Sequence, residues 1–265
     1  MQGRKYFRDE FMNLFFTLCK KLNTCFLLSV LLSQAAVAAV TITGTRVVFP
    51  GAEREKIVRT TNKGELPVLV QVWVDDGSKI EDINKTKVPF TVTPPVYRME
   101  PGRGQSVRLI YNGMTLPQDR ESVFWFNLLE IPPVNEQSAE NDRLELAFRT
   151  RIKVFYRPSS LKGSSSDVLE SLRLSVNTSG RSIKITNPSP YYFSFEAGSI
   201  ETPNGKYSLN VDMVDPKSSR DFEINSTASS VSNIKAISLR YITDYGSVKE
   251  KKFIQSGSSY ILQKQ

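Results

Sequence analysis

The sequence predicts an all-β protein with two β-sandwich domains that follow a removable N-terminal segment. Short β-rich runs separated by turn residues recur from residue 39 onward, and no stretch of comparable length keeps a helical period. Several runs place apolar residues at both odd and even positions, which favours two sheets packed face to face. A serine-rich stretch divides the runs into two sets. These observations together give the expected fold class.

The first 38 residues have the order of a secretory signal peptide. Lys20 and Lys21 precede an apolar run at residues 25–32, and small residues follow at Ala36 and Ala38. A basic start, an apolar centre and small residues before the cleavage site predict export and cleavage after Ala38. The apolar run is too short to span a bilayer.

The mature chain is expected to begin at Ala39 and to carry no cysteine, because Cys19 and Cys25 leave with the signal peptide. Core packing alone must then stabilise the fold, without a disulfide or a thiolate metal site. The opening residues are long and acidic for a signal peptide, so the sequence leaves open whether Met1 or Met12 is the true start.

The composition argues against an enzyme and against a nucleic-acid-binding protein. The chain has no histidine, which removes the commonest general base and most zinc sites, so we expect no cofactor and no metal. Ser232 and Lys235 have the S-x-x-K spacing, but no S-D-N or K-T-G motif accompanies them. Asp75 and Asp76 precede Gly77 and are interpreted as turn residues. The formal net charge of +8 falls to +5 without the predicted signal peptide, and this modest excess, spread along the chain, favours solubility over nucleic-acid binding.

The first domain is expected to span residues 39–158. Its strands are predicted at residues 40–49, 55–62, 67–76, 89–95, 105–112, 122–131 and 143–158, between turn clusters rich in Gly, Pro, Asn and Asp. This number of short strands in a domain of about 120 residues indicates an immunoglobulin-like sandwich.

The last predicted strand of this domain, at residues 143–158, is about twice the usual strand length. Its even positions include Leu144, Leu146, Phe148 and Ile152, while its odd positions are mostly charged. A soluble protein must cover such an apolar face, so the sequence raises the question of what lies against it.

The second domain is expected to span residues 167–265, after a linker at residues 159–166. Aromatic residues become rarer and serine becomes commoner at this boundary. Strands are predicted at residues 171–176, 181–187, 191–200, 207–214, 220–225, 234–244 and 248–255. They are shorter and more polar than the first set and indicate a second sandwich or barrel.

Several phrases in order resemble the periplasmic pilus-assembly chaperones of the chaperone/usher pathway. They are TRVVFP at 45–50, LVQVWVDD at 69–76, PFTVTPPVYRMEPGRGQSVRLIY at 89–111, LPQDRESVFWFNLLEIPP at 116–133, LAFRTRIKVFYRP at 146–158, ITNPSPYYFSF at 185–195 and YITDYG at 241–246. The resemblance implies two immunoglobulin-like domains with a cleft between them and a periplasmic location. It implies a chaperone that binds pilus (fimbrial) subunits by donor-strand complementation, prevents their aggregation and delivers them to an outer-membrane usher.

The resemblance also answers what covers the long strand. In this family that strand lies at an open edge of the first domain and is lent to a subunit that lacks its own final strand. Unpaired N–H and C=O groups along such an edge form a template for pairing. Leu144, Leu146 and Phe148 match the apolar residues that are lent.

Arg46 and Lys153 match the cations that bind the subunit's C-terminal carboxylate in this family. A guanidinium can hold a carboxylate with two hydrogen bonds, and an ammonium adds a compact charge. Under strict alternation Lys153 points away from the face that bears Phe148. Therefore the strand bends or carries a bulge, or the two contacts use different faces.

Glu121, Arg157 and Asp244 match the charged residues that join the two domains in this family. An isolated exposed ion pair contributes only about 0 to 1 kcal/mol. We therefore expect these three residues to orient the domains more than to stabilise them.

The alternative reading is a structural pilus subunit or adhesin with a β-sandwich fold. Such a protein would carry an incomplete sandwich and a donor extension near its mature N-terminus, usually with a disulfide. This chain has two full strand sets and no cysteine after residue 38. The sequence does not name the cognate subunits or the usher, and it leaves open whether the free protein associates with itself through the exposed strand.

Overall fold

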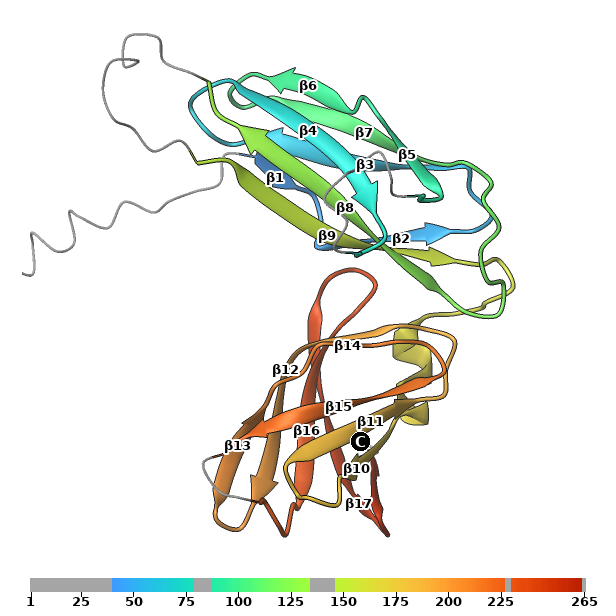
Figure 1. The fold of residues 1–265 in the computed structure, drawn as a ribbon, viewed down its shortest axis with the longest axis vertical. Helices are drawn as coiled ribbons and strands as arrows, with labels where there is room; N and C mark the ends of the chain where they lie inside the picture. Colours follow the sequence, from blue (N-terminus) through green and yellow to red (C-terminus); the bar gives the residue numbers. More distant parts are fainter. Residues whose placement is uncertain (1–39, 79–86, 134–145, 227–229, 264–265) are drawn as a thin grey trace, which may run out of the picture. The chain divides into compact units, whose positions relative to one another are not determined.

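The computed structural model describes residues 40–78, 87–133, 146–226 and 230–263. The predicted signal peptide at residues 1–38 and the predicted site residue Leu144 lie outside these ranges. Within them the chain is almost entirely β, with the short 3-10 helix η3 (Ser165–Ser171) between two sets of strands (Figure 1). No helix in the described ranges has the length and apolar character required to cross a membrane.

Strands β1 to β9 form a sandwich of two sheets, as expected (Figure 1). One sheet contains, in spatial order, β1 (Val40–Ile42), β3 (Glu55–Asn62), β7 (Gly104–Tyr111) and β5 (Phe90–Thr93). The other contains β2 (Arg46–Pro50), β9 (Phe148–Arg157), β8 (Ser122–Ile131), β4 (Val68–Asp75) and β6 (Val96–Met99). Alternate side chains from both sheets, such as Val70, Val107 and Phe126, are fully buried in one shared core.

The single strand predicted at residues 40–49 was wrong, because this segment forms two strands in different sheets. β1 pairs antiparallel with β3, whereas β2 pairs parallel with β9. The chain changes sheets at Gly44, which has a φ of 93°. Glycine adopts this conformation readily because it has no Cβ. The short strand β6 was also missed.

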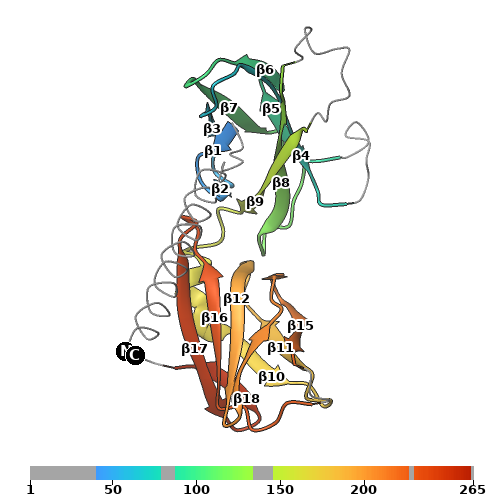
Figure 2. The same cartoon turned by 90° about the vertical axis from the view of Figure 1, so that its left-hand side faces the viewer.

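The predicted long strand begins later than expected. β9 starts at Phe148, so Leu146 precedes it, and residues 143–145 are not described. Its neighbour β8 ends at Ile131, immediately before Pro132 and Pro133. Prolines have no N–H to donate to a ladder, so the β8–β9 ladder ends where Phe148 faces Glu130. β8 and β9 run side by side in both ribbon views (Figure 1, Figure 2).

The second set of strands closes into a sandwich of its own. Its order is β13 (Gly205–Leu209), β15 (Ser218–Asn225), β11 (Ser182–Asn187), β10 (Arg173–Val176), β18 (Ser259–Leu262), β17 (Val248–Ser256), β16 (Ala236–Ile242), β12 (Phe193–Thr202) and β14 (Met213–Val214). β13 also pairs with β12, which joins the two ends of the sheet. The predicted strand at residues 207–214 is split between β13 and β14, and β18 was not predicted. A separate core with Ile185, Phe193 and Leu239 fills this sandwich.

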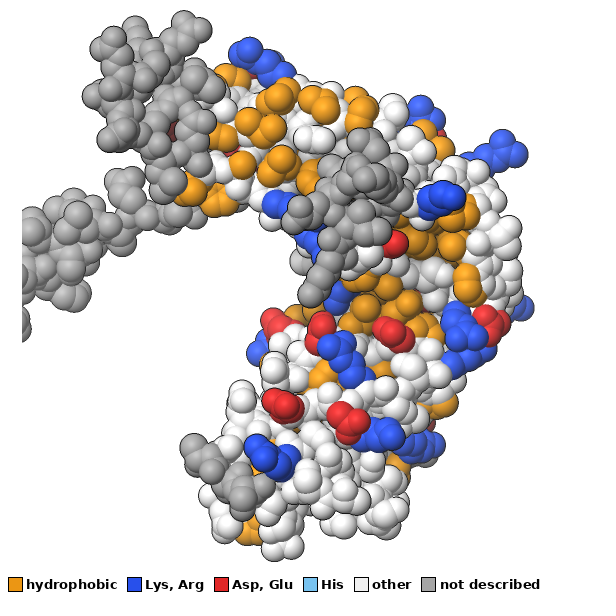
Figure 3. All heavy atoms as spheres, viewed as in Figure 1, with side chains coloured by type: hydrophobic (Ala, Val, Ile, Leu, Met, Phe, Trp, Pro, Cys, Tyr) orange, Lys and Arg blue, Asp and Glu red, His pale blue; other side chains and the backbone are white. Residues whose placement is uncertain are grey.

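The two sandwiches differ in surface character. On the face drawn in Figure 3, hydrophobic side chains gather over the first sandwich, and few appear on the second. The exposed apolar residues of the first sandwich include Leu146 and Phe148, whose side chains are 55% and 46% exposed. This contrast agrees with the more polar composition of the second strand set.

Candidate functional site

The candidate site is centred on an edge of β9 that is only half covered. β8 pairs with β9 along its whole length, from Phe148 to Tyr156. On the opposite edge β2 pairs in parallel only from Lys153 to Arg157. Among the described residues, no strand pairs with that edge over residues 148–152. We call the uncovered edge of residues 148–152 the notch. It exists because the chain joins this sheet only at Arg46, after leaving β1.

Phe148 lies at the open end of this notch. Phe148, Ile152 and Val154 share the core-facing side of β9, and burial increases along the strand from half-exposed Phe148 to fully buried Val154. An incoming strand would therefore continue the core of the first sandwich. Leu146 lies just before β9 and is exposed. Leu144, the third residue matched to the lent strand, is not described.

The orientation of Lys153 is resolved by the register. The β8–β9 pairs advance one residue at a time without a shift, so no bulge occurs in this ladder. Lys153 and Phe155 therefore lie on the face opposite Phe148 and Ile152. Of the options that the sequence left open, the structure favours contacts that use two faces of the same strand.

Arg46 and Lys153 are direct neighbours in the parallel β2–β9 register. The guanidinium of Arg46 lies 5.4 Å from the ring centre of Phe155 and donates from Nη1 to the carbonyl oxygen of Ile242 at 3.2 Å. Its Nε is buried and has no hydrogen-bond partner among the described residues. Burial lowers the pKa of Arg46, an effect that the negative charges of Asp244 and Glu121 oppose.

Lys153 is partly buried, with 26% of its side chain exposed. Its Nζ lies 3.8 Å from Oδ1 of Asp212, which also contacts Arg220. Burial lowers the pKa of Lys153, Asp212 opposes this shift, and the positive charge of Arg46 adds to it. These two adjacent cations have the charge and the N–H donors that an anion would require.

Glu121, Arg157 and Asp244 come together in one network that connects the two sandwiches. Arg157 donates from Nε to Glu121 Oε1 at 2.7 Å and from Nη1 to Asp244 Oδ2 at 2.8 Å. Glu121 also accepts the backbone N–H of Tyr192 at 2.9 Å, and Arg157 stacks on the ring of Tyr191. Glu121 is 3% exposed. Burial raises the pKa of its carboxyl group, and the charge of Arg157 opposes that shift.

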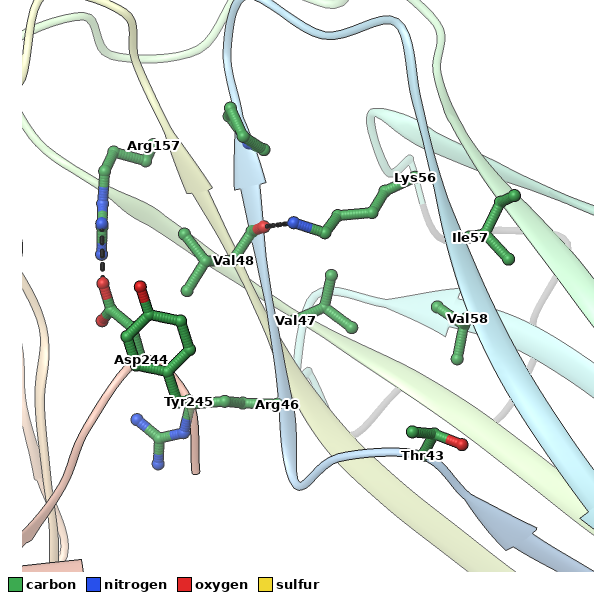
Figure 4. A pocket seen from close by; sticks show the side chains of 11 residues that line it. Thr43, Arg46, Val47, Val48, Lys56, Ile57, Val58, Arg157, Asp244 and Tyr245 are labelled. Atoms are coloured by element: carbon green, nitrogen blue, oxygen red, sulfur yellow. Dashed lines mark hydrogen bonds and ion pairs between the residues drawn. The ribbon is translucent and has the colours of Figure 1, made fainter. Parts of the chain in front are cut away.

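A pocket of about 340 Å³ lies beside this network and includes Arg46 (Figure 4). Residues of β2 and β3 line one part, and Asp244 and Tyr245 of the second sandwich line another. Lys153 is not among its lining residues, so this pocket contains only one of the two expected cations. No group of His, Cys, Asp and Glu suited to a metal ion occurs within the described ranges.

Sequence reasoning missed Asp212, the acidic partner of Lys153. It lies in the short connection between β13 and β14, where no periodic pattern points to a contact. The predicted turn role of Asp75 and Asp76 agrees with the structure, since their carboxylates accept the N–H groups of Gly77 and Ser78. Asp75 also binds side chains of β8 and β9, and no pattern in the sequence predicts these contacts.

Comparison with known families matches both sandwiches. The profile described as "Pili and flagellar-assembly chaperone, PapD N-terminal domain" matches residues 39–162, and "Pili assembly chaperone PapD, C-terminal domain" matches residues 167–253. The probable fimbrial chaperone YadV of Escherichia coli K12 is 41% identical, over 85% of this chain and 94% of its own. The chaperone protein FimB/FhaD of Bordetella pertussis is 36% identical, over 82% of this chain and 88% of its own.

Solved structures agree. The crystal structure of the YadV chaperone has a TM-score of 0.71 at 40% identity and covers 82% of this chain and 100% of its own. The SafB chaperone of Salmonella enterica, in complex with the SafA pilin, has a TM-score of 0.69 at 27% identity, with coverage of 83% and 98%. The proteins of this family are periplasmic chaperones and not enzymes. Because both domain profiles match in order over most of its length, the chain belongs to the PapD-type family of pili assembly chaperones.

Proposed function

We propose that this protein is exported to the periplasm with removal of residues 1–38 and captures pilus (fimbrial) subunits there by donor-strand complementation. The observation that carries the proposal is the notch on β9, where, within the part of the chain that the structure describes, residues 148–152 have a strand on one edge only and Phe148 is half exposed. A subunit strand laid in this notch would gain backbone hydrogen bonds and an apolar cover. The captured subunit would then pass to an outer-membrane usher.

Arg46 and Lys153 would anchor the subunit's C-terminal carboxylate. The buried Nε of Arg46 has no hydrogen-bond partner in the described ranges, and a buried donor without a partner is costly in a folded protein. A carboxylate could accept this N–H and also pair with the ammonium of Lys153. Glu121, Arg157 and Asp244 would hold the two sandwiches in the orientation that this contact needs.

The expected binding free energies differ between the strand and the two cations. Burying Leu144, Leu146 and Phe148 would contribute roughly 1.5 to 3 kcal/mol each, and each strand hydrogen bond adds about 0.5 to 1.5 kcal/mol. The two cations would add roughly 1.5 to 3 kcal/mol apiece, while association costs some 4 to 15 kcal/mol. The strand therefore supplies most of the affinity and the cations set the register, because a slip of two residues keeps the alternation but misplaces the carboxylate.

Calorimetric titration with a synthetic β-strand peptide tests this division. The peptide has alternating apolar residues and is made with either a free C-terminal carboxylate or a C-terminal amide. Wild type is expected to bind the carboxylate form more tightly by a factor of about ten or more, the equivalent of one charge-assisted bond. Lys153→Ala should lose this preference, whereas Phe148→Glu should weaken binding of both forms because it places a charge in the apolar notch.

The matched control is Lys184→Ala, since Lys184 is an exposed lysine on β11 of the second sandwich. It should bind both peptides as wild type does. Equal binding by wild type, Lys153→Ala and Phe148→Glu would rule the proposal out.

A further inference from the structure

The charged face of β9 carries two arginines that the capture site does not use. The guanidinium of Arg149 lies 5.0 Å from the ring centre of Trp73, and that of Arg151 lies 4.7 Å from the ring centre of Trp125. Both arginines also contact one carboxylate, that of Asp75. These residues lie on the outer side of the sheet, opposite the core-facing Phe148 and Ile152.

The contacts reach across the sheet. Trp73 and Asp75 belong to β4, which is separated from β9 by β8. The Oδ1 of Asn127 on β8 accepts the Nε of Arg149 at 3.0 Å, and its Nδ2 donates to Asp75 Oδ2 at 2.8 Å. Asn127 is fully buried and the side chain of Asp75 is only 14% exposed. The two arginines therefore link β9 to its neighbour β8 and to β4, the next strand of the sheet.

Arg149 and Arg151 lie within residues 148–152, the segment of β9 that forms the notch. Residues 153–157 are held between β8 and β2, but among the described strands residues 148–152 pair with β8 alone. The contacts of Arg149 and Arg151 therefore add to the single ladder that holds this half of β9. We propose that Arg149 and Arg151 keep this half of β9 extended and in register before a client strand arrives. They are positioning residues, since they face away from the client.

The inference rests on the proposed capture function, and it makes a kinetic claim. If the notch is formed in only a fraction of the molecules, the apparent affinity for a client, meaning a subunit strand that binds in the notch, is the intrinsic affinity multiplied by that fraction. The side-chain contacts of Arg149 and Arg151 act before the subunit strand binds, so their loss should slow association. Dissociation should stay unchanged, because the client strand itself holds the edge once it is bound.

The test compares wild type with the double variant Arg149→Gln/Arg151→Gln. Hydrogen exchange should become roughly five- to thirtyfold faster for those amides of residues 148–152 that donate to β8, the loss expected for two exposed cation–π contacts and their ion pairs. Amides of residues 153–157 should not change. The association rate of the carboxylate-terminated strand peptide should fall, with an unchanged dissociation rate.

Two further variants complete the design. Arg98→Gln removes an exposed arginine on β6 of the same sheet, which pairs with Glu100 just after that strand, and it should behave as wild type. Arg149→Lys/Arg151→Lys keeps both charges and should restore part of the association rate. If wild type captures the peptide and the Gln double variant captures it at the same rate, the inference is wrong. If wild type does not capture the peptide, the proposed function itself fails.

Discussion

At the scale of single residues, Lys153 is not a free cation in the unbound protein. Its ammonium lies 3.8 Å from Asp212, whose other oxygen lies 3.5 Å from Arg220. A client carboxylate would have to displace Asp212 or share Lys153 with it. The contact is partly exposed, so its contribution is within the range of about 0 to 1 kcal/mol for such pairs.

Replacing Asp212 with asparagine should therefore strengthen the anchor. Asp212→Asn is expected to bind a carboxylate-terminated strand peptide up to about fivefold more tightly, the equivalent of about 1 kcal/mol. Binding of the amidated peptide should not change, because it places no anion at Lys153. Calorimetric titration of both peptides measures the difference.

Asp221→Asn is the matched control, because it removes an exposed carboxylate of the same sandwich, on β15. Any general effect of one lost negative charge would appear in both variants. Weaker binding of the carboxylate peptide by Asp212→Asn would mean that Asp212 positions Lys153 and does not compete for it.

Residue roles divide clearly into those that a sequence can reveal and those that it cannot. Arg46 and Lys153 were singled out through a resemblance, and the parallel register of β2 with β9 makes them neighbours. Alternation along one strand could not show this, because the pairing joins distant segments. Asp212 gave no signal at all, since it lies in an irregular connection and its contact depends on the three-dimensional fold.

At the scale of elements, the change of sheet at Gly44 creates the notch on β9. A straight strand over residues 40–49 would have remained in one sheet. The turn instead directs the chain to β9 only at Arg46. Strand existence was predictable from the two-residue period, as β3, β4 and β8 illustrate. The ends of β2 and β9 were not, because they depend on which partner strand is present and where its prolines fall.

Gly44 should consequently resist substitution. Gly44→Ala places a side chain at a φ of 93°, a conformation that costs about 1 to 2 kcal/mol for residues with a Cβ. The free energy of unfolding, measured by urea denaturation, should fall by that amount.

Ser106→Ala on β7 provides the comparison, because Ser106 is an exposed strand residue. It should stay within about 0.5 kcal/mol of wild type. An unchanged stability of Gly44→Ala would show that the segment can turn without glycine.

At the scale of the whole molecule, Arg157 connects the two sandwiches through Glu121 and Asp244. These charges are largely buried, with side-chain exposures of 14% for Arg157 and 21% for Asp244. Such bonds contribute more than the exposed pairs considered from the sequence. We therefore expect the network to stabilise the protein measurably, in addition to the mainly orienting role that the sequence predicts.

Asp244→Asn should lower the free energy of unfolding by about 1.5 to 3 kcal/mol, the range for a hydrogen bond to a charged group. Urea denaturation of the full chain measures this change. The same variant should weaken capture of the carboxylate peptide if the network orients Arg46 toward it. Normal stability together with normal capture would show that the connection between the sandwiches does not depend on this bond.

The spacing between Lys153 and Phe148 on one strand has a final consequence. The two residues are five positions apart, which is about 16 Å at the rise of an extended chain. In a bound chain that contacts both residues, the C-terminal carboxylate and the last apolar side chain would have to be separated by this distance. A subunit tail whose last apolar side chain lies nearer to its carboxylate, or farther from it, would reach only one of the two residues. If β9 captures subunits as proposed, it would select them by this spacing as well as by chemistry.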